Sequence, residues 1–540
     1  MGEILYDHFE EYVGAYMFLC LGLTLFTGLP VAVALGGIAI IFAYLGVYFE
    51  YLDMIYLSGF IPVPKEMFII LPRMWGGDGS SGAIQNPILV AIPCFIFMGT
   101  MLERSRVAAD LLHILQVVLK RVPGGLALSI TLMGTIMAAT TGIIGASVVM
   151  MTLLALPTML DRGYNTPLAT GTIASSATLG ILIPPSIMLV LMANLLSVSV
   201  GNLFIGAILP GLLLSGLYAI YILSISTLRP DMAPPLPADA IQLQPTNHAH
   251  MKRYLMIVGG LIIAAIVLSN VSAVEGVSWG LLAFFAIFAI SMIMGRAEGN
   301  SLFGAILKGM MPPIFLITLV LGSIFAGWAT PTEAAGVGAF GSIILALFNS
   351  TLTKKVLTEV CHRTALTTAM IFFIFLGATT FSYMFRALYG EDLIIEFIEF
   401  LNLGAWPLLI MLMAVIFLLG FFFDFIEITL IILPVFAPII KALGPEFAPH
   451  LGVEGAAIQH IQAQTIYWFA ILAAVNLQTS FLTPPFGFAL FYMKGVAPQS
   501  VKMTDIYKGI IPFVILQLIG LSIVIIFPQI TLWLPELMLD

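Results

Sequence analysis

The sequence predicts an all-α polytopic membrane protein built as an inverted repeat, and three observations support this fold class. Of the 540 residues, 60% are hydrophobic and only 9% are charged, whereas soluble domains carry about 25% charged residues. Apolar runs of about 20 residues, the length that crosses a bilayer, recur along the chain. Two of these runs, one in each half, are interrupted by a Pro-Pro pair that hydroxyl side chains precede.

The first interruption lies in residues 165–194, a segment without any charged side chain. Pro184 and Pro185 cannot donate backbone hydrogen bonds, the residue before a proline avoids helical geometry, and Gly180 adds backbone freedom upstream. We therefore expect the helix to break near Leu182–Ser186. Lipid offers no partner to the freed carbonyl groups, so the break must be packed in protein or line a wet cavity. Hydroxyl side chains crowd this region: Thr172, Ser175, Ser176, Thr178 and Ser186.

The second interruption lies in residues 475–487, where Thr479, Ser480 and Thr483 precede Pro484 and Pro485. Paired broken helices in the two halves of a membrane chain are typical of secondary transporters, with an ion or substrate site between the halves. The plainer alternative is a pair of proline kinks in ordinary membrane helices.

Each broken helix follows a long apolar run with a polar centre, which predicts a re-entrant hairpin. In the run of about 124–160, the tip is expected at Thr141–Ser147, although these small residues also suit close helix packing. In the run of about 405–443, Asp424 and Glu427 stand at i and i+3 and are expected on one helix face. An acid within a membrane is costly, so both are candidate site residues. Glu427 alternatively pairs with a cation elsewhere.

Charge placement predicts opposite orientations for the two hairpins. The connections around the second hairpin hold mostly acids, so this hairpin is expected to open outward. The ends of the first hairpin lie near basic residues, which the positive-inside rule places in the cytoplasm. These basic residues are Arg104, Arg106, Lys120, Arg121 and Arg162.

The sequence thus divides into a first half at 1–228, a linker at 229–300 with two extra membrane spans, and a second half at 301–540. The second broken helix is expected at about 464–493. Glu333 follows Thr330 and Pro331 directly before an apolar run, and helix capping explains this acid at least as well as ion binding does.

Composition also excludes several classes of function. The formal net charge is −8 and no basic patch is present, so no nucleic-acid partner is expected. The sequence has no nucleotide-binding motif, so we expect no direct use of ATP. We also expect neither enzymatic activity nor a cofactor.

Several motifs spread over about residues 12–530 together resemble one family. They are Ile92–Gly99, Ala169–Ser186, Ala329–Ala335, Asp424 within its hairpin, and Asn476–Gly487. The chain resembles the large membrane subunit of tripartite ATP-independent periplasmic (TRAP) transporters, within the ion-transporter superfamily. The run Ile96–Ser105 looks most like the branch associated with keto acids and other organic carboxylates.

This resemblance implies sodium-driven import of an organic acid anion, a dicarboxylate or a keto-acid-like compound, across the bacterial inner membrane. A periplasmic binding protein would deliver the substrate, a small four-helix membrane subunit would complete the complex, and the transport half would move like an elevator against a static scaffold. Sodium would be the coupling ion.

By resemblance, the sodium sites lie between each hairpin tip and the nearby helix break. The first would involve Thr141, Gly142, Ser147, Gly180 and Pro184, and the second Asp424, Thr479, Ser480 and Thr483. The wider candidate set for sodium and substrate adds Ser175, Ser186, Glu427 and Pro484. The chain departs from the family at the first tip, where Ile143 replaces a hydroxyl residue, and at Gln478, which replaces an acid.

Three other functions compete with this interpretation. A stand-alone sodium-coupled carboxylate transporter or antiporter of the same superfamily would need no binding protein. A proton-channel subunit of a respiratory complex would carry charged relays within its spans, but charges at mid-membrane are almost confined to Asp424 and Glu427. A structural membrane scaffold has no need of paired breaks.

Overall fold

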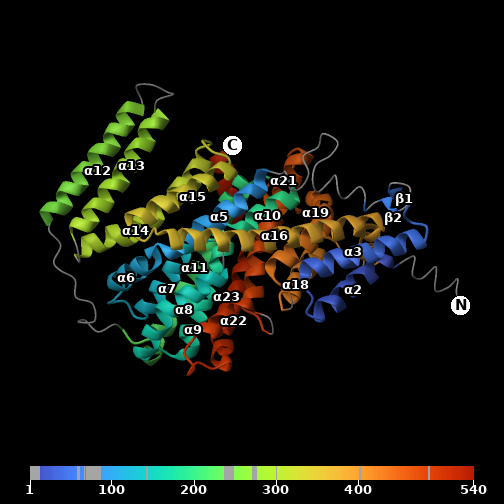
Figure 1. Ribbon diagram of the computed structural model, residues 1–540, viewed down its shortest axis with the longest axis horizontal. Helices are drawn as coiled ribbons and strands as arrows, with labels where there is room; N and C mark the ends of the chain where they lie inside the picture. Colours follow the sequence, from blue (N-terminus) through green and yellow to red (C-terminus); the bar gives the residue numbers. More distant parts are fainter. Residues whose placement is uncertain are drawn as a thin grey trace.

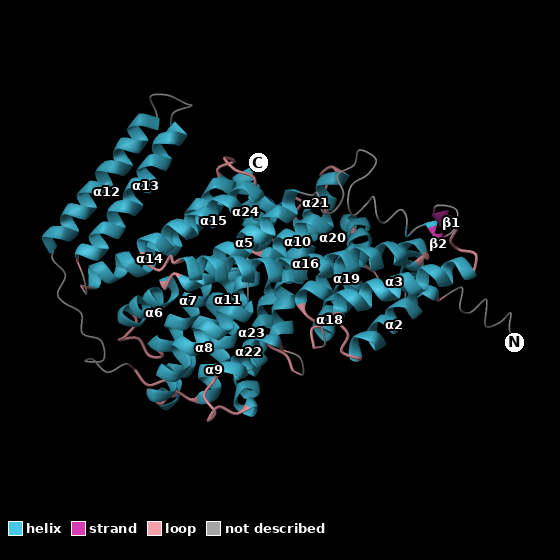
Figure 2. Ribbon diagram, viewed as in Figure 1, coloured by secondary structure: helices cyan, strands magenta, loops and turns pink. Residues whose placement is uncertain are grey.

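The computed structural model describes residues 12–57, 61–65, 67, 87–141, 144–235, 248–269, 276–298, 301–400, 404–421, 423–484 and 487–539. Within these ranges the chain is almost entirely helical (Figure 2). Ten of the described helices are long and apolar enough to cross a membrane. The prediction of an all-α polytopic membrane protein is therefore confirmed.

The elements of the first half follow the order expected from the apolar runs. They are α2 (Val13–Phe26), α3 (Val31–Tyr48), β1 (Met54–Leu57), β2 (Ile61–Pro64), α5 (Pro87–Arg104), α6 (Val107–Val118), α7 (Gly125–Thr141), α8 (Ile144–Asp161), α9 (Thr166–Thr178), the 3₁₀ turn η2 (Leu179–Ile181), α10 (Ile187–Leu196), α11 (Val200–Leu228) and η3 (Pro230–Met232). The strands form one small antiparallel pair in which Met54 lies opposite Pro64.

The second half repeats this order after an additional helix pair. Its elements are α12 (His248–Ser269), α13 (Gly276–Ala297), α14 (Leu302–Phe325), α15 (Pro331–Phe348), α16 (Lys354–Ala387), α17 (Gly390–Phe400), α18 (Ala405–Leu419), α19 (Phe425–Ala442), α20 (Gly444–Leu451), α21 (Ile458–Leu477), η4 (Gln478–Phe481), α22 (Phe488–Val496), α23 (Met503–Ile526) and α24 (Gln529–Leu539). The second broken helix thus begins at Ile458, before the expected start near residue 464.

The two halves exchange equivalent contacts, as a two-fold repeat requires. Helix α3 packs on α16 while α15 packs on α5, and α6 packs on α14 while α17 packs on α2. Closer to the breaks, α8 packs on α22 while α19 packs on α10, and α9 packs on α23 while α21 packs on α11. Each half therefore completes the other, in agreement with the predicted repeat of hairpin and broken helix.

Close backbone contact joins the halves where α9 crosses α23. A Cβ atom added to Gly509 would lie 2.1 Å from the carbonyl oxygen of Pro167, and one added to Gly171 would lie 2.1 Å from the carbonyl oxygen of Gly509. Without side chains at these two positions, the helix backbones touch, which is the usual way that membrane helices gain packing contacts.

Two features extend the molecule along its long axis (Figure 1). Helix α16 runs across the middle, in gold, towards the α2–α3 pair at one end. At the other end α12 and α13 project from the body, and α13 packs on α14. Helices α12 and α13 correspond to the two extra segments predicted in the linker. Helix α12 is long and apolar enough to span, whereas the apolar stretch found in α13 is the shorter Ala283–Ala297.

Candidate functional site

The first helix break lies where the double proline predicts it. Helix α9 ends at Thr178, one 3₁₀ turn follows, and α10 begins at Ile187. The whole stretch between the two helices is buried, Gly180 and Pro184 included. The Ser186 hydroxyl donates a hydrogen bond to the carbonyl oxygen of Ile181. A side chain of the break therefore satisfies a carbonyl group that the break has freed.

The first hairpin packs directly on the helix that leads into this break. A Cβ atom added to Gly134 on α7 would lie 2.6 Å from the carbonyl oxygen of Ser176, and the Ser176 hydroxyl donates to Thr131 over 3.3 Å. The Ser175 hydroxyl instead donates to the carbonyl oxygen of Gly171 in its own helix, over 2.8 Å.

The predicted tip of the first hairpin is only partly described. Helix α7 ends at Thr141, and Gly142 and Ile143 lie outside the described residues, as does the side chain of Thr141. Ser147 is buried in the first turns of α8. A Cβ atom added to Gly145 would lie 3.0 Å from the ring of Tyr492, which belongs to the helix after the second break. The start of α8 thus reaches the other half of the repeat.

The second helix break mirrors the first. Helix α21 ends at Leu477, η4 ends at Phe481, and α22 starts at Phe488. The hydroxyl groups of Thr479, Ser480 and Thr483 donate to carbonyl oxygens three or four residues earlier, over 2.7, 2.7 and 3.0 Å respectively. These three side chains are buried, whereas Pro484 is exposed and Pro485 lies outside the described residues.

The tip of the second hairpin touches the second break. Gly420 follows the last residue of α18, and a Cβ atom added there would lie 2.7 Å from Cβ of Ser480 and 3.0 Å from its Cα. Two turns earlier in α18, the carbonyl oxygen of Met413 accepts a hydrogen bond of 2.7 Å from Nδ2 of Asn476. Hairpin and break are therefore held together at two points.

The two acids of this hairpin form a capping box, which corrects the expectation that they share one helix face. Asp424 is the N-cap residue of α19, in extended geometry with φ −76° and ψ 159°. Its Oδ1 accepts from the backbone N–H of Phe425 over 2.8 Å, and Oε2 of Glu427 accepts from the N–H of Asp424 over 3.2 Å. Both carboxylates thus lie at the start of the helix, where backbone N–H groups stabilise negative charge.

Several buried oxygen atoms, on the helices of the breaks and on α19, have no hydrogen-bond partner within the described part of the chain. They belong to Thr172, Thr429, Asn476 and Gln478. A buried polar atom left without a partner costs about 1–3 kcal/mol. The sequence argument placed Thr172 at the first break and Asn476 and Gln478 within the second interruption, but it named none of the four as a site residue. The signal for these residues is an uncharged polar residue within an apolar run, which is weaker than the signal from an acid.

Glu333 serves the capping role that the sequence allowed. Its Oε2 accepts from the backbone N–H of Thr330 over 2.8 Å and from the Thr330 hydroxyl over 2.9 Å. Together they form a capping box at the start of α15, which explains this acid without an ion.

Two hairpins, two broken helices beside them and the reciprocal contacts between the halves define a polytopic membrane transport protein. The chain belongs to the family described as "Tripartite ATP-independent periplasmic transporter, DctM component", whose family model matches residues 18–530.

Relatives in this family differ in what their names say they transport. The chain is 27% identical over 511 residues to the C4-dicarboxylate TRAP transporter large permease protein DctM of Vibrio cholerae, covering 89% of this chain and 94% of that protein. It is 26% identical to the ectoine permease TeaC of Halomonas elongata, over 88% of this chain and 95% of that protein. It is 24% identical to the sialic acid permease SiaM of Vibrio cholerae, over 92% of this chain and 98% of that protein.

A solved structure shares the fold. The YdaH transporter of Alcanivorax borkumensis aligns with a TM-score of 0.50 at 13% sequence identity, covering 97% of this chain and 99% of that chain. At this identity the likeness concerns the fold alone.

Proposed function

We propose that the chain is the transport subunit of a sodium-driven TRAP transporter that imports an organic acid anion across the bacterial inner membrane. The observation that carries this proposal is the contact between the second hairpin tip and the second break, at Gly420 and Ser480. Asp424 follows Gly420 by four residues, and the ring of its neighbour Phe425 lies 5.2 Å from that of Phe481, in the turn that carries Thr479 and Ser480.

The chemistry of this region suits sodium. Sodium ions take oxygen ligands, and unwound backbone next to hydroxyl groups supplies them in transporters. Oxygen atoms of Asn476 and Gln478 at the second break, and of Thr429 on α19, are buried without a partner in the described ranges. Thr172, in the helix that leads to the first break, has a buried hydroxyl oxygen that likewise lacks a partner in the described ranges. We assign the first sodium site to this break and the tip Thr141–Ser147.

The substrate anion is assigned to the space between the two breaks. Helices α10 and α22 begin directly after the breaks, and helix N-termini favour negative charge. The names of relatives include two organic acids, C4-dicarboxylates and sialic acid, which supports an organic acid as cargo.

We further propose an elevator-like movement and two partners. The hairpins and broken helices would move as one unit against a scaffold that includes α3 and α16, which pack on each other. A periplasmic binding protein would deliver the acid, and a small membrane subunit would complete the scaffold. The domain limits follow the repeat: 1–228, the linker 229–300, and 301–540.

Reconstitution tests this proposal. If the neighbouring reading frames encode a binding protein, a thermal-shift screen of that protein identifies its acid. Proteoliposomes with both membrane subunits then receive that acid with the binding protein outside. Uptake should require an inward sodium gradient and should stop when the binding protein is omitted. Equal uptake with potassium in place of sodium would refute sodium coupling. Uptake that needs no binding protein would favour a stand-alone carboxylate transporter.

A further inference from the structure

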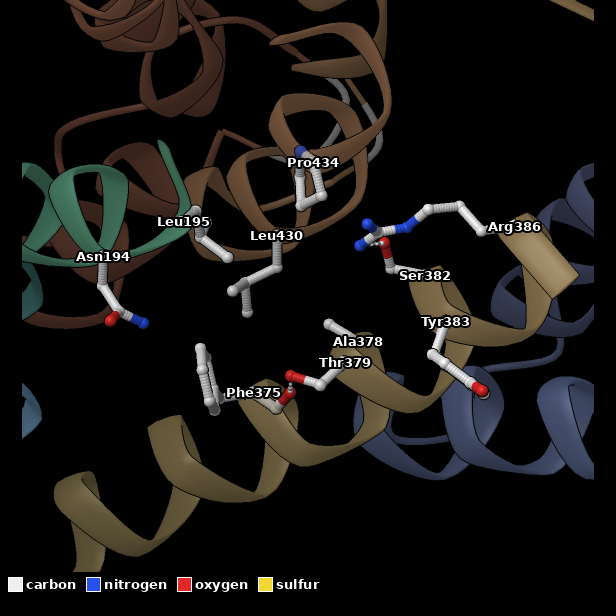
Figure 3. Close-up of a pocket in the computed structure, with 10 residues that line it drawn as sticks. All are labelled: Asn194, Leu195, Phe375, Ala378, Thr379, Ser382, Tyr383, Arg386, Leu430 and Pro434. Carbon is white, nitrogen blue, oxygen red and sulfur yellow. Dashed lines mark hydrogen bonds between the residues drawn. The ribbon is translucent and has the colours of Figure 1, made fainter. Parts of the chain in front are cut away.

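A cavity of about 210 Å³ lies between the long helix α16 and the two helices α10 and α19 (Figure 3). Phe375, Ser382 and Arg386 line it from α16, Asn194 from α10, and Leu430 and Pro434 from α19. Under the proposed mechanism, α16 belongs to the static scaffold and the other two helices to the moving unit. The cavity therefore lies at the boundary between these two parts.

The cavity is close to both predicted sites. On α19, Leu430 and Pro434 follow Glu427 by one and two helical turns, so all three residues share a face of the helix. On α10, Asn194 lies about 10 Å along the helix from the end of the first break, at 1.5 Å per residue. A ligand in the cavity would therefore lie within reach of the hairpin that carries Asp424 and Glu427.

Arg386 supplies a positive charge whose hydrogen-bonding capacity is mostly unused. Its Nη2 lies 3.5 Å from Oγ of Ser382, and its Nε lies 3.6 Å from Oε1 of Glu391. These are the polar contacts of the guanidinium among the described residues, and both are long for hydrogen bonds. A guanidinium has five N–H donors arranged to hold a carboxylate with two parallel bonds. Arg386 can therefore bind an acid without giving up a strong internal partner.

The rest of the lining defines the shape of the ligand. Arg386 and Ser382 lie at one end of the cavity and the Asn194 amide at the other, with Phe375, Thr379 and Leu430 between them (Figure 3). The Thr379 hydroxyl donates to the carbonyl oxygen of Phe375 over 2.8 Å, so the middle of the lining is mainly apolar. This order fits a carboxylate, a short apolar body and a terminal hydrogen-bonding group. The volume of about 210 Å³ is below the range of about 300–1,000 Å³ usual for pockets of drug-sized ligands, which favours an acid of only a few carbon atoms.

We propose that Arg386 and Ser382 bind the carboxylate of a small organic acid in this cavity, and that the cavity is a station of the transported substrate at the scaffold boundary. This inference rests on the proposed function, because it names the class of acid and a residue that binds it. It adds a substrate-binding residue on α16, outside the hairpins and the breaks.

The test measures acid binding by the purified complex, through its thermal stabilisation as the acid is titrated. The probes are 4-hydroxybutyrate, which has the expected pattern of groups, butyrate, which lacks the terminal hydroxyl, and inorganic phosphate. We expect 4-hydroxybutyrate to bind more tightly than butyrate, and phosphate not to compete. In Arg386→Gln, binding of 4-hydroxybutyrate should weaken roughly tenfold to a hundredfold, because a charge-assisted double hydrogen bond is lost. Arg386→Lys keeps the positive charge but loses the paired N–H donors of the guanidinium. Its affinity for 4-hydroxybutyrate should therefore lie between that of the unchanged protein and that of Arg386→Gln.

Arg363→Gln is the matched control. Arg363 lies on the same helix, its side chain is 46% exposed against 51% for Arg386, and it also pairs with a glutamate, Glu359. This variant should bind the acid as the unchanged protein does.

Glu391→Gln separates ligand binding from a merely structural ion pair. If Arg386 and Glu391 only stabilise the fold, Arg386→Gln and Glu391→Gln should lower the thermal stability of the complex to the same extent. If Arg386 binds the acid, removing the competing carboxylate of Glu391 should instead tighten binding by roughly twofold to fivefold, the range of a partly exposed pair.

Three results would overturn the inference: no stabilisation by 4-hydroxybutyrate, equal binding in Arg386→Gln, or competition by phosphate, which would indicate a lipid headgroup site instead. None of these results contradicts the proposed function. That proposal is refuted separately if uptake by the complete complex does not depend on the sodium gradient.

Discussion

Gly420→Ala perturbs the contact on which the proposed sodium site depends. The added Cβ atom would lie 2.7 Å from Cβ of Ser480, where ordinary van der Waals contact begins at 3.4 Å. The hairpin tip and the break must therefore separate by about 0.7 Å, the difference between these two distances. The backbone at Gly420 has φ −59° and ψ −15°, which alanine adopts readily. The effect of the substitution is therefore steric.

The cost of this overpacking should be about 1–3 kcal/mol. If the strain is relieved by moving the tip away from the break, the same energy appears as weaker sodium binding, roughly fivefold to a hundredfold. Separation of only a few tenths of an ångström is enough, because a cation held by both elements needs oxygen atoms from each at ligand distance.

The assay is the sodium concentration that gives half-maximal uptake in proteoliposomes, together with the melting temperature of the purified complex in sodium and in potassium. Gly404→Ala is the control, since it lies at the other end of α18 and its added Cβ atom would meet no described atom within 4 Å. Gly420→Ala should raise the half-maximal sodium concentration while Gly404→Ala leaves it unchanged. Identical sodium dependence in both variants would refute the reasoning.

Further substitutions separate capping from ion binding at the acids. Asp424→Asn should keep the helix stable, because Asn caps a helix about as well as Asp. It should nevertheless lower the uptake rate, and the dependence of that rate on sodium, at least tenfold. Unchanged sodium dependence at a normal melting temperature would assign Asp424 to capping alone. Glu333→Gln should leave both uptake and melting temperature within error of the unchanged protein, because Gln also completes a capping box with Thr330. Loss of uptake in a stable Glu333→Gln variant would show that its charge has a transport role.

The breaks were predictable from the sequence because their cause is local. A double proline removes two backbone donors and restricts the preceding residue, whatever surrounds it, and α9 and α21 give way to 3₁₀ turns shortly before Pro184 and Pro484. The hairpins were predictable for a related reason, since small or polar residues in the middle of an apolar run mark a turn.

The position of Asp424 was not predictable from spacing alone. The interval to Glu427 fits two positions on a helix face and equally fits an N-cap residue and its partner at N3. The choice depends on where α19 begins, and the structure shows that it begins with the capping box of Asp424 and Glu427.

Arg386 was also missed as a site residue, because from the sequence it is a basic residue at the end of a membrane span. Its role depends on packing between helices far apart in the chain, which places α19 against both α10 and α16. Only the structure shows that this helix is unbroken from Lys354 to Ala387.

The most direct test of the central claim is amide hydrogen exchange of the complex in sodium compared with potassium. If cations bind where the two helices unwind, sodium should slow exchange in residues 179–183 and 478–483, and the α12–α13 pair should exchange alike in both salts. Equal exchange at both breaks, under conditions in which sodium still drives uptake, would contradict the account.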